Sequence, residues 1–252
     1  MIDAFLAIPL TTLVCAPLVV LLAYTVLGIT GFGSALIAVP LLVQVLPLRF
    51  AVPMLLLLDL PGSLIIGTTN RAAIARPEIW RIVPFMFVGI ALGATVLVNA
   101  PEKLLLFILG VFVLGYAAYG MLVRAEAELI NPAWAVPLGT LGGAISALFG
   151  TGGPMFVIYL ARRLHDKTAL RATITAVLSL SALSRFGVFT FAGLYAQPNI
   201  VPVAAGLFPF MLAGLWLGNR LHYRLSAKHV KQGLWLILII GGASLIARSL
   251  LT

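Results

Sequence analysis

The sequence has few charged residues and almost no cysteine. Only 9% of its 252 residues are charged, whereas 62% are hydrophobic. A soluble globular protein needs more polar residues than this to cover its surface, so the composition excludes that class. Cys15 is the single cysteine, which excludes an intrachain disulfide and any multi-cysteine metal or redox centre.

Catalytic and metal-binding motifs are also missing from the sequence. It has no HExxH, GxSxG, Walker or CxxC pattern, and its three histidines lie in or beside basic connections. We therefore expect no enzyme, no cofactor and no metal, although a membrane-embedded enzyme or assembly factor remains a minor alternative. The net charge of +9 comes from Lys and Arg in short connections between apolar segments, which indicates membrane topology and lipid contacts rather than nucleic-acid binding.

Long apolar segments take up most of the chain. Several reach the roughly 20 residues that cross a bilayer core, which predicts an all-α polytopic protein with one membrane domain over residues 1–252. The start of the chain lacks a basic region and a cleavage site, so we expect no removable signal peptide. The less ambiguous spans are predicted at about 50–70, 80–100, 103–123, 170–195, 199–220 and 231–249.

An internal repeat organises the sequence. PFMFVGIALG at 84–93 and PFMLAGLWLG at 209–218 share six identities in ten positions. The Gly-rich GITGFGSAL at 28–36 has a Gly-rich counterpart, LFGTGGPMF at 148–156, at a similar spacing along the sequence. This predicts two repeats of about four helical segments each, 1–125 and 126–252. The paired glycines at 89/93 and 214/218 have the small-xxx-small spacing of close helix packing, and we interpret them as packing positions.

Two uncharged runs are too long for one straight membrane span. No charge lies between Asp3 and Arg49 or between Glu128 and Arg162, which leaves runs of 45 and 33 residues. Each run contains a Gly-rich motif, and Gly and Pro weaken or end helices. We therefore predict two helical hairpins, at 5–47 and 131–161, with Gly-rich tips near the middle of the bilayer. A kink that only permits tight packing is the alternative.

The positions of the basic residues favour the hairpins. If both runs turn back without crossing, three Lys and Arg lie on one face, Arg49, Lys103 and Arg248, and twelve lie on the other: Arg71, Arg76, Arg81, Arg124, Arg162, Arg163, Lys167, Arg171, Arg220, Arg224, Lys228 and Lys231. If each run crosses once, the split is only ten against five. The positive-inside rule prefers the first arrangement. It predicts inverted repeats with both termini outside the cytoplasm, which is a transporter architecture.

The Gly-rich tips are candidate anion sites. A half-helix that begins near Ser34 or Gly153 presents free N–H groups at its positive end, and irregular backbone inside a membrane is tolerated where protein or a water-filled cavity satisfies it. Two tips related by a pseudo-twofold axis would form one central site. The candidate residues, which supply backbone N–H groups or hydroxyls, are Thr30, Gly31, Gly33, Ser34, Gly150, Thr151, Gly152 and Gly153, and Ser146 is a further hydroxyl donor.

These motifs resemble a known family. With GITGFGSALIAVPLL at 28–42 and GTLGGAISALFGTGGPMFVIYL at 139–160, nearly the whole chain resembles the sulfite exporter TauE/SafE family of membrane transporters. The resemblance implies transport of sulfur-containing oxyanions such as sulfite or organosulfonates, directed outward. An anionic substrate agrees with the half-helix argument, which does not depend on the resemblance.

Two charged residues lie inside predicted spans. Arg185 is about fourteen residues into its span, where an unpaired Arg costs ~3 kcal/mol or more, so we expect it to face a cavity or a partner. Its planar fork suits an oxyanion, but an ion pair or a contact with a helix carbonyl is equally consistent with the sequence. Asp59 lies in the equivalent span of the first half, where it could carry a coupling proton or neutralise Arg185.

The sequence thus predicts a secondary transporter in the inner membrane that exports a small sulfur oxyanion or organosulfonate, coupled to a proton gradient. A passive anion channel is the alternative, in which the same tips and Arg185 form a selectivity constriction. The expected partners are the small anion and the lipid bilayer, with no nucleic acid, and homo-oligomerisation is left open.

Overall fold

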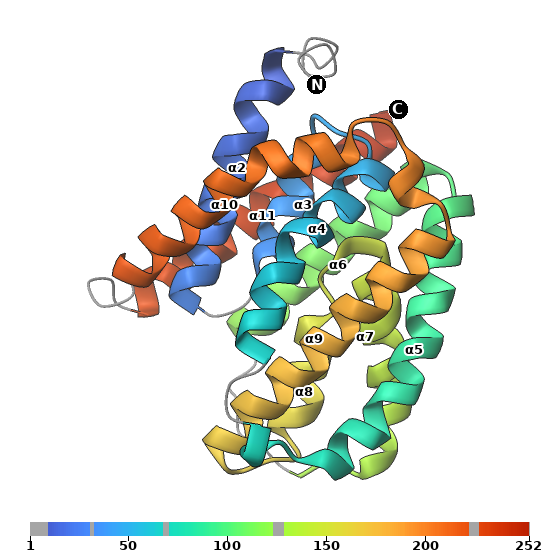
Figure 1. Ribbon diagram of the computed structural model, residues 1–252, viewed down its shortest axis with the longest axis vertical. Coiled ribbons are helices and arrows are strands. Elements are labelled where there is room, and N and C mark those ends of the chain that lie inside the picture. The colour runs from blue at the N-terminus through green and yellow to red at the C-terminus, as the bar shows by residue number, and fades with distance from the viewer. Residues whose placement is uncertain (1–9, 31–32, 68–70, 123–128, 222–226, 252) are drawn as a thin grey trace. The chain divides into compact units, whose positions relative to one another are not determined.

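The fold is described by a computed structural model of the chain, which covers residues 10–30, 33–67, 71–122, 129–221 and 227–251 (Figure 1). Within these ranges the chain forms ten α-helices and no strand. In chain order they are α2 (Leu10–Thr30), α3 (Ser34–Leu42), α4 (Leu48–Gly67), α5 (Arg76–Asn99), α6 (Glu102–Leu122), α7 (Ala135–Phe149), α8 (Gly153–Ala161), α9 (Lys167–Phe191), α10 (Ile200–Leu221) and α11 (Ala227–Leu251). The predicted all-helical class is confirmed.

Six segments are long and apolar enough to cross a membrane: Thr12–Ile29, Arg76–Asn99, Glu102–Met121, Pro132–Phe149, Lys167–Phe191 and Ile200–Leu221. Large apolar side chains lie exposed on these helices, among them Phe191 at 94% and Trp80 at 76%. Exposed apolar surface on this scale is abnormal in water and normal against lipid. The chain is therefore a multi-pass membrane protein, as its composition predicts.

The chain divides into two compact units that alternate along the sequence. Unit 1 contains residues 1–55, 100–124 and 196–252, and unit 2 contains residues 56–99 and 125–195. Each unit therefore combines segments from both halves of the chain, and the boundary falls within α4. The division of the sequence into repeats at 1–125 and 126–252 stays a prediction, because a compact unit is not a test of duplication.

Unit 1 is built on close packing between α2 and α10. A Cβ added at Gly218 would lie 2.2 Å from the carbonyl oxygen of Thr25, and one at Gly214 would lie 2.6 Å from that of Leu21. Gly28 has the same role on α2, because its Cβ would lie 2.9 Å from the carbonyl oxygen of Leu215. The two helices run side by side in Figure 1. Larger residues at these positions would force the backbones apart.

Unit 2 has a matching contact between α5 and α7. A Cβ at Gly89 would lie 2.0 Å from the carbonyl oxygen of Thr140, and one at Gly93 would lie 2.5 Å from that of Ala144. On α7, a Cβ at Gly143 would lie 2.2 Å from the carbonyl oxygen of Met86. The repeated PFM…G…LG helix of each half thus packs on the helix that precedes the Gly-rich motif of the other half.

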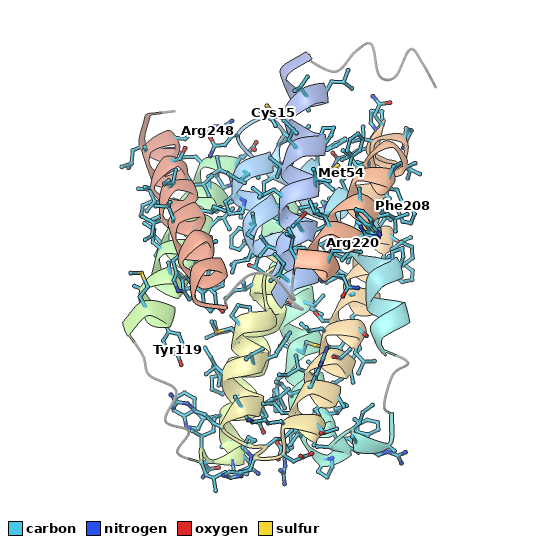
Figure 2. The ribbon with its side chains drawn as sticks, turned by 90° about the vertical axis from the view of Figure 1, so that its left-hand side faces the viewer. Cys15, Met54, Tyr119, Phe208, Arg220 and Arg248 are labelled. Atoms are coloured by element: carbon cyan, nitrogen blue, oxygen red, sulfur yellow. The ribbon has the colours of Figure 1, made fainter. Side chains whose placement is uncertain are left out.

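Three arginines of unit 1 contact backbone carbonyls or an aromatic ring. Arg248, labelled near the end of α11 in Figure 2, donates a hydrogen bond to the carbonyl of Val43. Arg49 donates to the carbonyl of Ala100 at 2.7 Å. Arg220, also labelled in Figure 2, lies 4.1 Å from the centre of the Trp216 ring. These cations are therefore held by carbonyl dipoles and an aromatic face.

Both Gly-rich motifs lie between a longer helix and a nine-residue helix. α2 and α3 are separated by residues 31–33, and α7 and α8 by residues 150–152. At the far end of the first pair, Thr12 Oγ1 donates to the carbonyl of Val45 at 3.3 Å. At the far end of the second, the Ile130 N–H donates to the carbonyl of Arg162 at 3.3 Å. The two ends of each pair therefore meet.

Candidate functional site

The segment between α7 and α8 is shaped by its glycines and proline. α7 ends at Phe149, and the next residue, Gly150, has a φ of 70° and donates its N–H to the carbonyl of Ser146 at 2.8 Å. This left-handed conformation favours glycine at helix ends. α8 then begins at Gly153, and Pro154 occupies its first turn, where the missing N–H breaks no helix bond. We name residues 150–153 the second tip.

Gly152 brings the second tip onto the surface of α7. A Cβ at this position would lie 2.0 Å from the carbonyl oxygen of Gly142 and 2.0 Å from Ser146 Oγ. Real Cβ contacts are not this short, so only glycine fits. Gly153 lies against α9 instead, where its Cβ would meet Leu178 at an ordinary 3.4 Å. The second tip is therefore packed between α7 and α9 within unit 2.

Arg185 reaches the same region from α9. Its side chain is buried, and Nη1 donates a hydrogen bond to the Ser146 carbonyl at 3.2 Å. This carbonyl also accepts the Gly150 N–H, so the guanidinium lies at the negative end of the α7 dipole. The carbonyl contact that the sequence left open is thus present. It places a positive charge beside the second tip.

Thr151 is the buried hydroxyl of the second tip. The residue is 3% exposed, and Oγ1 has no hydrogen-bond partner in the part of the chain that the structure describes. A buried hydroxyl without a partner costs about 1–3 kcal/mol, which is a reason to expect a ligand or a water there. The start of α8, the Thr151 hydroxyl and the Arg185 charge form a region suited to an anion.

The first tip, residues 30–34, is described only in part. Gly33 has a φ of 95° and precedes α3, and Ser34 begins that helix as a buried residue. Gly31 and the Thr30 side chain lie outside the described residues. The two tips belong to different compact units. The expectation of one central site made by both tips therefore stays a prediction.

Asp59 lies on α4 and is partly exposed. It belongs to unit 2, as do Arg185 and the second tip. Its predicted pairing with Arg185 and its predicted role in proton coupling stay predictions.

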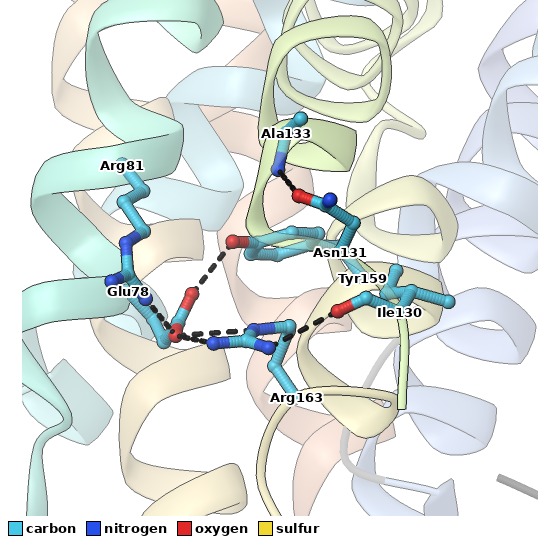
Figure 3. Close-up of polar contacts among 7 residues, drawn as sticks. All are labelled: Glu78, Arg81, Ile130, Asn131, Ala133, Tyr159 and Arg163. Atoms are coloured by element: carbon cyan, nitrogen blue, oxygen red, sulfur yellow. Dashed lines mark hydrogen bonds and ion pairs between the residues drawn. The ribbon is translucent and has the colours of Figure 1, made fainter. Parts of the chain in front are cut away.

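A second polar cluster in unit 2 was missed by sequence reasoning (Figure 3). Glu78, in the first turn of α5, is 5% exposed and accepts a 2.6 Å hydrogen bond from the Tyr159 hydroxyl. Its other oxygen accepts bonds from Arg81 at 2.6 Å and from Arg163 Nη2 at 2.9 Å. Arg163 also donates to the carbonyl of Ile130 at 3.1 Å. We name these residues the Glu78 cluster.

The Glu78 cluster joins α5 to the ends of the α7–α8 pair. Hydrogen bonding to Glu78 raises the pKa of Arg163, so the guanidinium stays charged. In the sequence, Arg81 and Arg163 read as topology signals in basic connections. Glu78 is one of only seven acidic residues, and three positions before Arg81 it has helical ion-pair spacing, which is the one signal that could have found the cluster.

The fold defines a multi-pass helical membrane protein in which the buried Arg185 lies beside the start of α8. Comparison with known proteins makes this more specific. The family model described as Sulfite exporter TauE/SafE matches residues 16–245. The chain therefore belongs to the sulfite exporter TauE/SafE family, a family of membrane transporters, and the resemblance seen in its Gly-rich motifs is confirmed.

One curated relative gives the same class. The chain is 28% identical over 193 residues to a protein of Comamonas testosteroni described as "Probable inner membrane transporter protein TsaS". The match covers 76% of this chain and 81% of the relative. No solved structure matches the chain.

Proposed function

We propose that this protein is a secondary transporter that exports a small sulfur-containing oxyanion, sulfite or an organosulfonate, across the inner membrane. The observation that carries the proposal is the second tip, where the start of α8, the buried Thr151 hydroxyl and Arg185 come together. Helix starts and guanidinium groups both favour oxyanions. The family's description as sulfite exporters supports the chemical class and the direction.

The length of α8 supports a binding site within the bilayer. Its nine residues rise about 13 Å at ~1.5 Å per residue, which is less than half of a ~30 Å hydrocarbon core. Its far end is followed by Arg162 and Arg163, and such charges belong near the membrane surface. On this basis we place the second tip inside the core, with Pro132–Phe149 as one arm of a hairpin rather than as the full crossing that its length would also allow.

Inverted repeats are the arrangement that we propose for the two halves. Equivalent helices of the two halves make equivalent contacts, which supports this arrangement. Gly89 and Gly93 of α5 pack on α7, and Gly214 and Gly218 of α10 pack on α2. The twelve-to-three division of basic residues supports an odd number of crossings in each half. Both termini then lie outside the cytoplasm. A reporter fused to the C-terminus should be active in the periplasm, and cytoplasmic activity would refute this topology.

Coupling to protons is proposed through Asp59. A carboxylate in an apolar helix of a transporter is a candidate proton carrier, because acidic residues inside membrane helices often belong to proton relays. The first tip, with Thr30, Gly31, Gly33 and Ser34, stays a proposed anion-binding helix start on the sequence argument alone.

Flux in proteoliposomes tests the proposed function. The purified protein should catalyse saturable uptake of labelled sulfite, with competition by taurine and methanesulfonate. An imposed proton gradient should accelerate uptake, and a protonophore should abolish the acceleration. Asp59→Asn should retain exchange of sulfite but lose the response to the gradient. Flux that never saturates would favour a channel, and the absence of flux with any sulfur anion would refute the proposal.

A further inference from the structure

Ser181 is a second buried hydroxyl beside the second tip. It is 1% exposed, and its Oγ has no hydrogen-bond partner among the residues that the structure describes. Other hydroxyls on α9 behave differently: Ser184 donates to the carbonyl of Leu180 at 2.6 Å and Thr190 to that of Phe186 at 2.7 Å. Hydroxyls in membrane helices commonly bond to their own backbone in this way. Ser181 does not.

The position of Ser181 is fixed by its neighbours on α9. Leu178, Ser181 and Arg185 are spaced i, i+3 and i+7, so they lie on one face of the helix. Leu178 meets Gly153 at the start of α8, and Arg185 meets the Ser146 carbonyl at the end of α7. Ser181 therefore lies on the same face of α9 as one contact with the second tip and one contact with the last turn of α7.

Tyr195 adds a third hydroxyl from beyond the end of α9. Its oxygen is buried and has no hydrogen-bond partner within the described ranges. Its ring packs against Phe186 and Phe189 with centroid separations of 5.5 Å and 6.4 Å, and Phe189 is one turn beyond Arg185. Burial raises the pKa of the Tyr195 hydroxyl, and the nearby positive charge of Arg185 opposes that rise. The hydroxyl is therefore a neutral donor, carried by a ring that packs one turn beyond Arg185.

We propose that Ser181 and Tyr195 donate hydrogen bonds to the same anion as Thr151 and Arg185, and that this donor set selects a three-oxygen SO3 group over a planar carboxylate. The inference rests on the proposed function and names two substrate-binding residues that the sequence motifs do not contain. The three hydroxyls come from the tip, from mid-α9 and from beyond α9. A sulfonate or sulfite can offer a separate oxygen to each, whereas a carboxylate must share two coplanar oxygens among three hydroxyls and a guanidinium, which we expect to give poorer hydrogen-bond geometry.

Because the Ser181 and Tyr195 hydroxyls have no hydrogen-bond partner among the described residues, a binding role and a structural role predict different effects when the hydroxyls are removed. A hydroxyl that stabilises the fold loses a bond when it is removed, whereas removal of an unsatisfied buried hydroxyl is neutral or stabilising. Ser181→Ala and Tyr195→Phe should therefore keep or raise the melting temperature of the ligand-free protein. Each should weaken the interaction with an anion by about tenfold, because a hydrogen bond to a charged group is lost.

The experiment measures labelled sulfite uptake into proteoliposomes, with methanesulfonate and acetate as competitors. Ser181→Ala and Tyr195→Phe should each raise the KM for sulfite about tenfold. In the wild type, methanesulfonate should compete with sulfite at least tenfold more strongly than acetate does. The two variants should reduce this ratio of inhibition constants. Matched controls are Ser184→Ala, whose hydroxyl is bonded to its own helix, and Tyr116→Phe, whose ring packs against Phe112 and Trp235 in unit 1. Both should leave KM unchanged.

The possible results separate the inference from the proposed function. If the wild type transports sulfite but both variants keep its KM and its competitor preference, the inference is wrong and the proposed function stands. A lower melting temperature with an unchanged KM would assign the hydroxyls a structural, water-mediated role and would also overturn it. If the wild type transports no sulfur anion, both proposals fail together.

Discussion

Two polar regions of unit 2 differ in how completely their hydrogen bonds are satisfied. In the Glu78 cluster, both carboxylate oxygens accept bonds and the phenol and guanidinium donors point at them. In the second tip the buried Thr151 hydroxyl, and on the neighbouring α9 the buried Ser181 hydroxyl, have no hydrogen-bond partner in the described part of the chain. A satisfied network holds helices together, whereas unsatisfied buried donors are expected where a ligand completes them. The first region is therefore structural and the second is the candidate for binding.

Gly152→Ala should have the largest effect, because it removes the contact that the second tip makes with α7. The added Cβ would lie 2.0 Å from a backbone oxygen, so the tip must move. We expect sulfite flux to fall at least a hundredfold, which corresponds to about 3 kcal/mol. Gly187→Ala on α9 is the control, since its Cβ meets nothing within 4 Å. Normal flux in Gly152→Ala would remove the second tip from the transport mechanism.

Glu78→Ala should have the next largest effect. It should lower the stability of the protein and leave the KM for sulfite unchanged. It leaves Arg163 and the Tyr159 hydroxyl without their acceptor, but Arg163 is 19% exposed and can turn partly toward water. We expect a loss of about 2 kcal/mol, below the cost of a fully buried pair. Thermal denaturation in detergent measures it, with Glu78→Gln as the variant that keeps an acceptor. A tenfold rise in the KM for sulfite at unchanged stability would place Glu78 in binding instead.

Arg185→Lys should separate charge from geometry. Lysine keeps the positive charge beside the second tip but loses the planar fork. We expect the KM for sulfite to rise about tenfold, with a larger rise in Arg185→Ala. Arg163→Lys provides the comparison from the Glu78 cluster, and it should lower the melting temperature without a change in KM. If Arg185→Lys and Arg163→Lys raise the KM equally, the second tip and the Glu78 cluster do not differ in their role in binding.

Tyr159→Phe should have the smallest effect. It removes one 2.6 Å hydrogen bond to Glu78 while Arg81 and Arg163 remain. The expected destabilisation is about 1 kcal/mol. Double-mutant analysis with Glu78→Gln should show coupling between the two positions, and strict additivity would mean that the bond contributes nothing.

Much of the fold followed from the sequence because membrane proteins separate apolar from charged residues so strongly. The all-helical class and the spans predicted at about 80–100, 103–123, 170–195 and 199–220 could be derived from hydrophobic length. The spans predicted at 50–70 and 231–249 are not among the six candidate spans of the described residues, which instead include Thr12–Ile29 and Pro132–Phe149 inside the predicted hairpins. The pairing of α5 with α7 and of α10 with α2 could not be derived from the sequence. A small-xxx-small pattern predicts that a helix packs closely but does not name its partner.

The candidate site was predictable only where one residue carried the signal. Arg185 stood out because a charge inside an apolar span is costly. Ser181 looked like any helical serine, and its lack of a backbone partner is a property of the folded chain. The Glu78 cluster joins side chains from positions 78, 159 and 163 with the backbone at 130, and no local pattern relates segments so far apart.

Equilibrium binding of labelled sulfite to the purified protein tests the central claim, that the second tip and Arg185 hold the anion. The decisive comparison is between the wild type and the double variant Asp59→Asn with Arg185→Gln, which removes the guanidinium without leaving the carboxylate charged. We predict saturable binding by the wild type, and a double variant that is folded by thermal denaturation but does not bind. A double variant that binds and transports sulfite as the wild type does would contradict the account, because Arg185 would then have only a structural role.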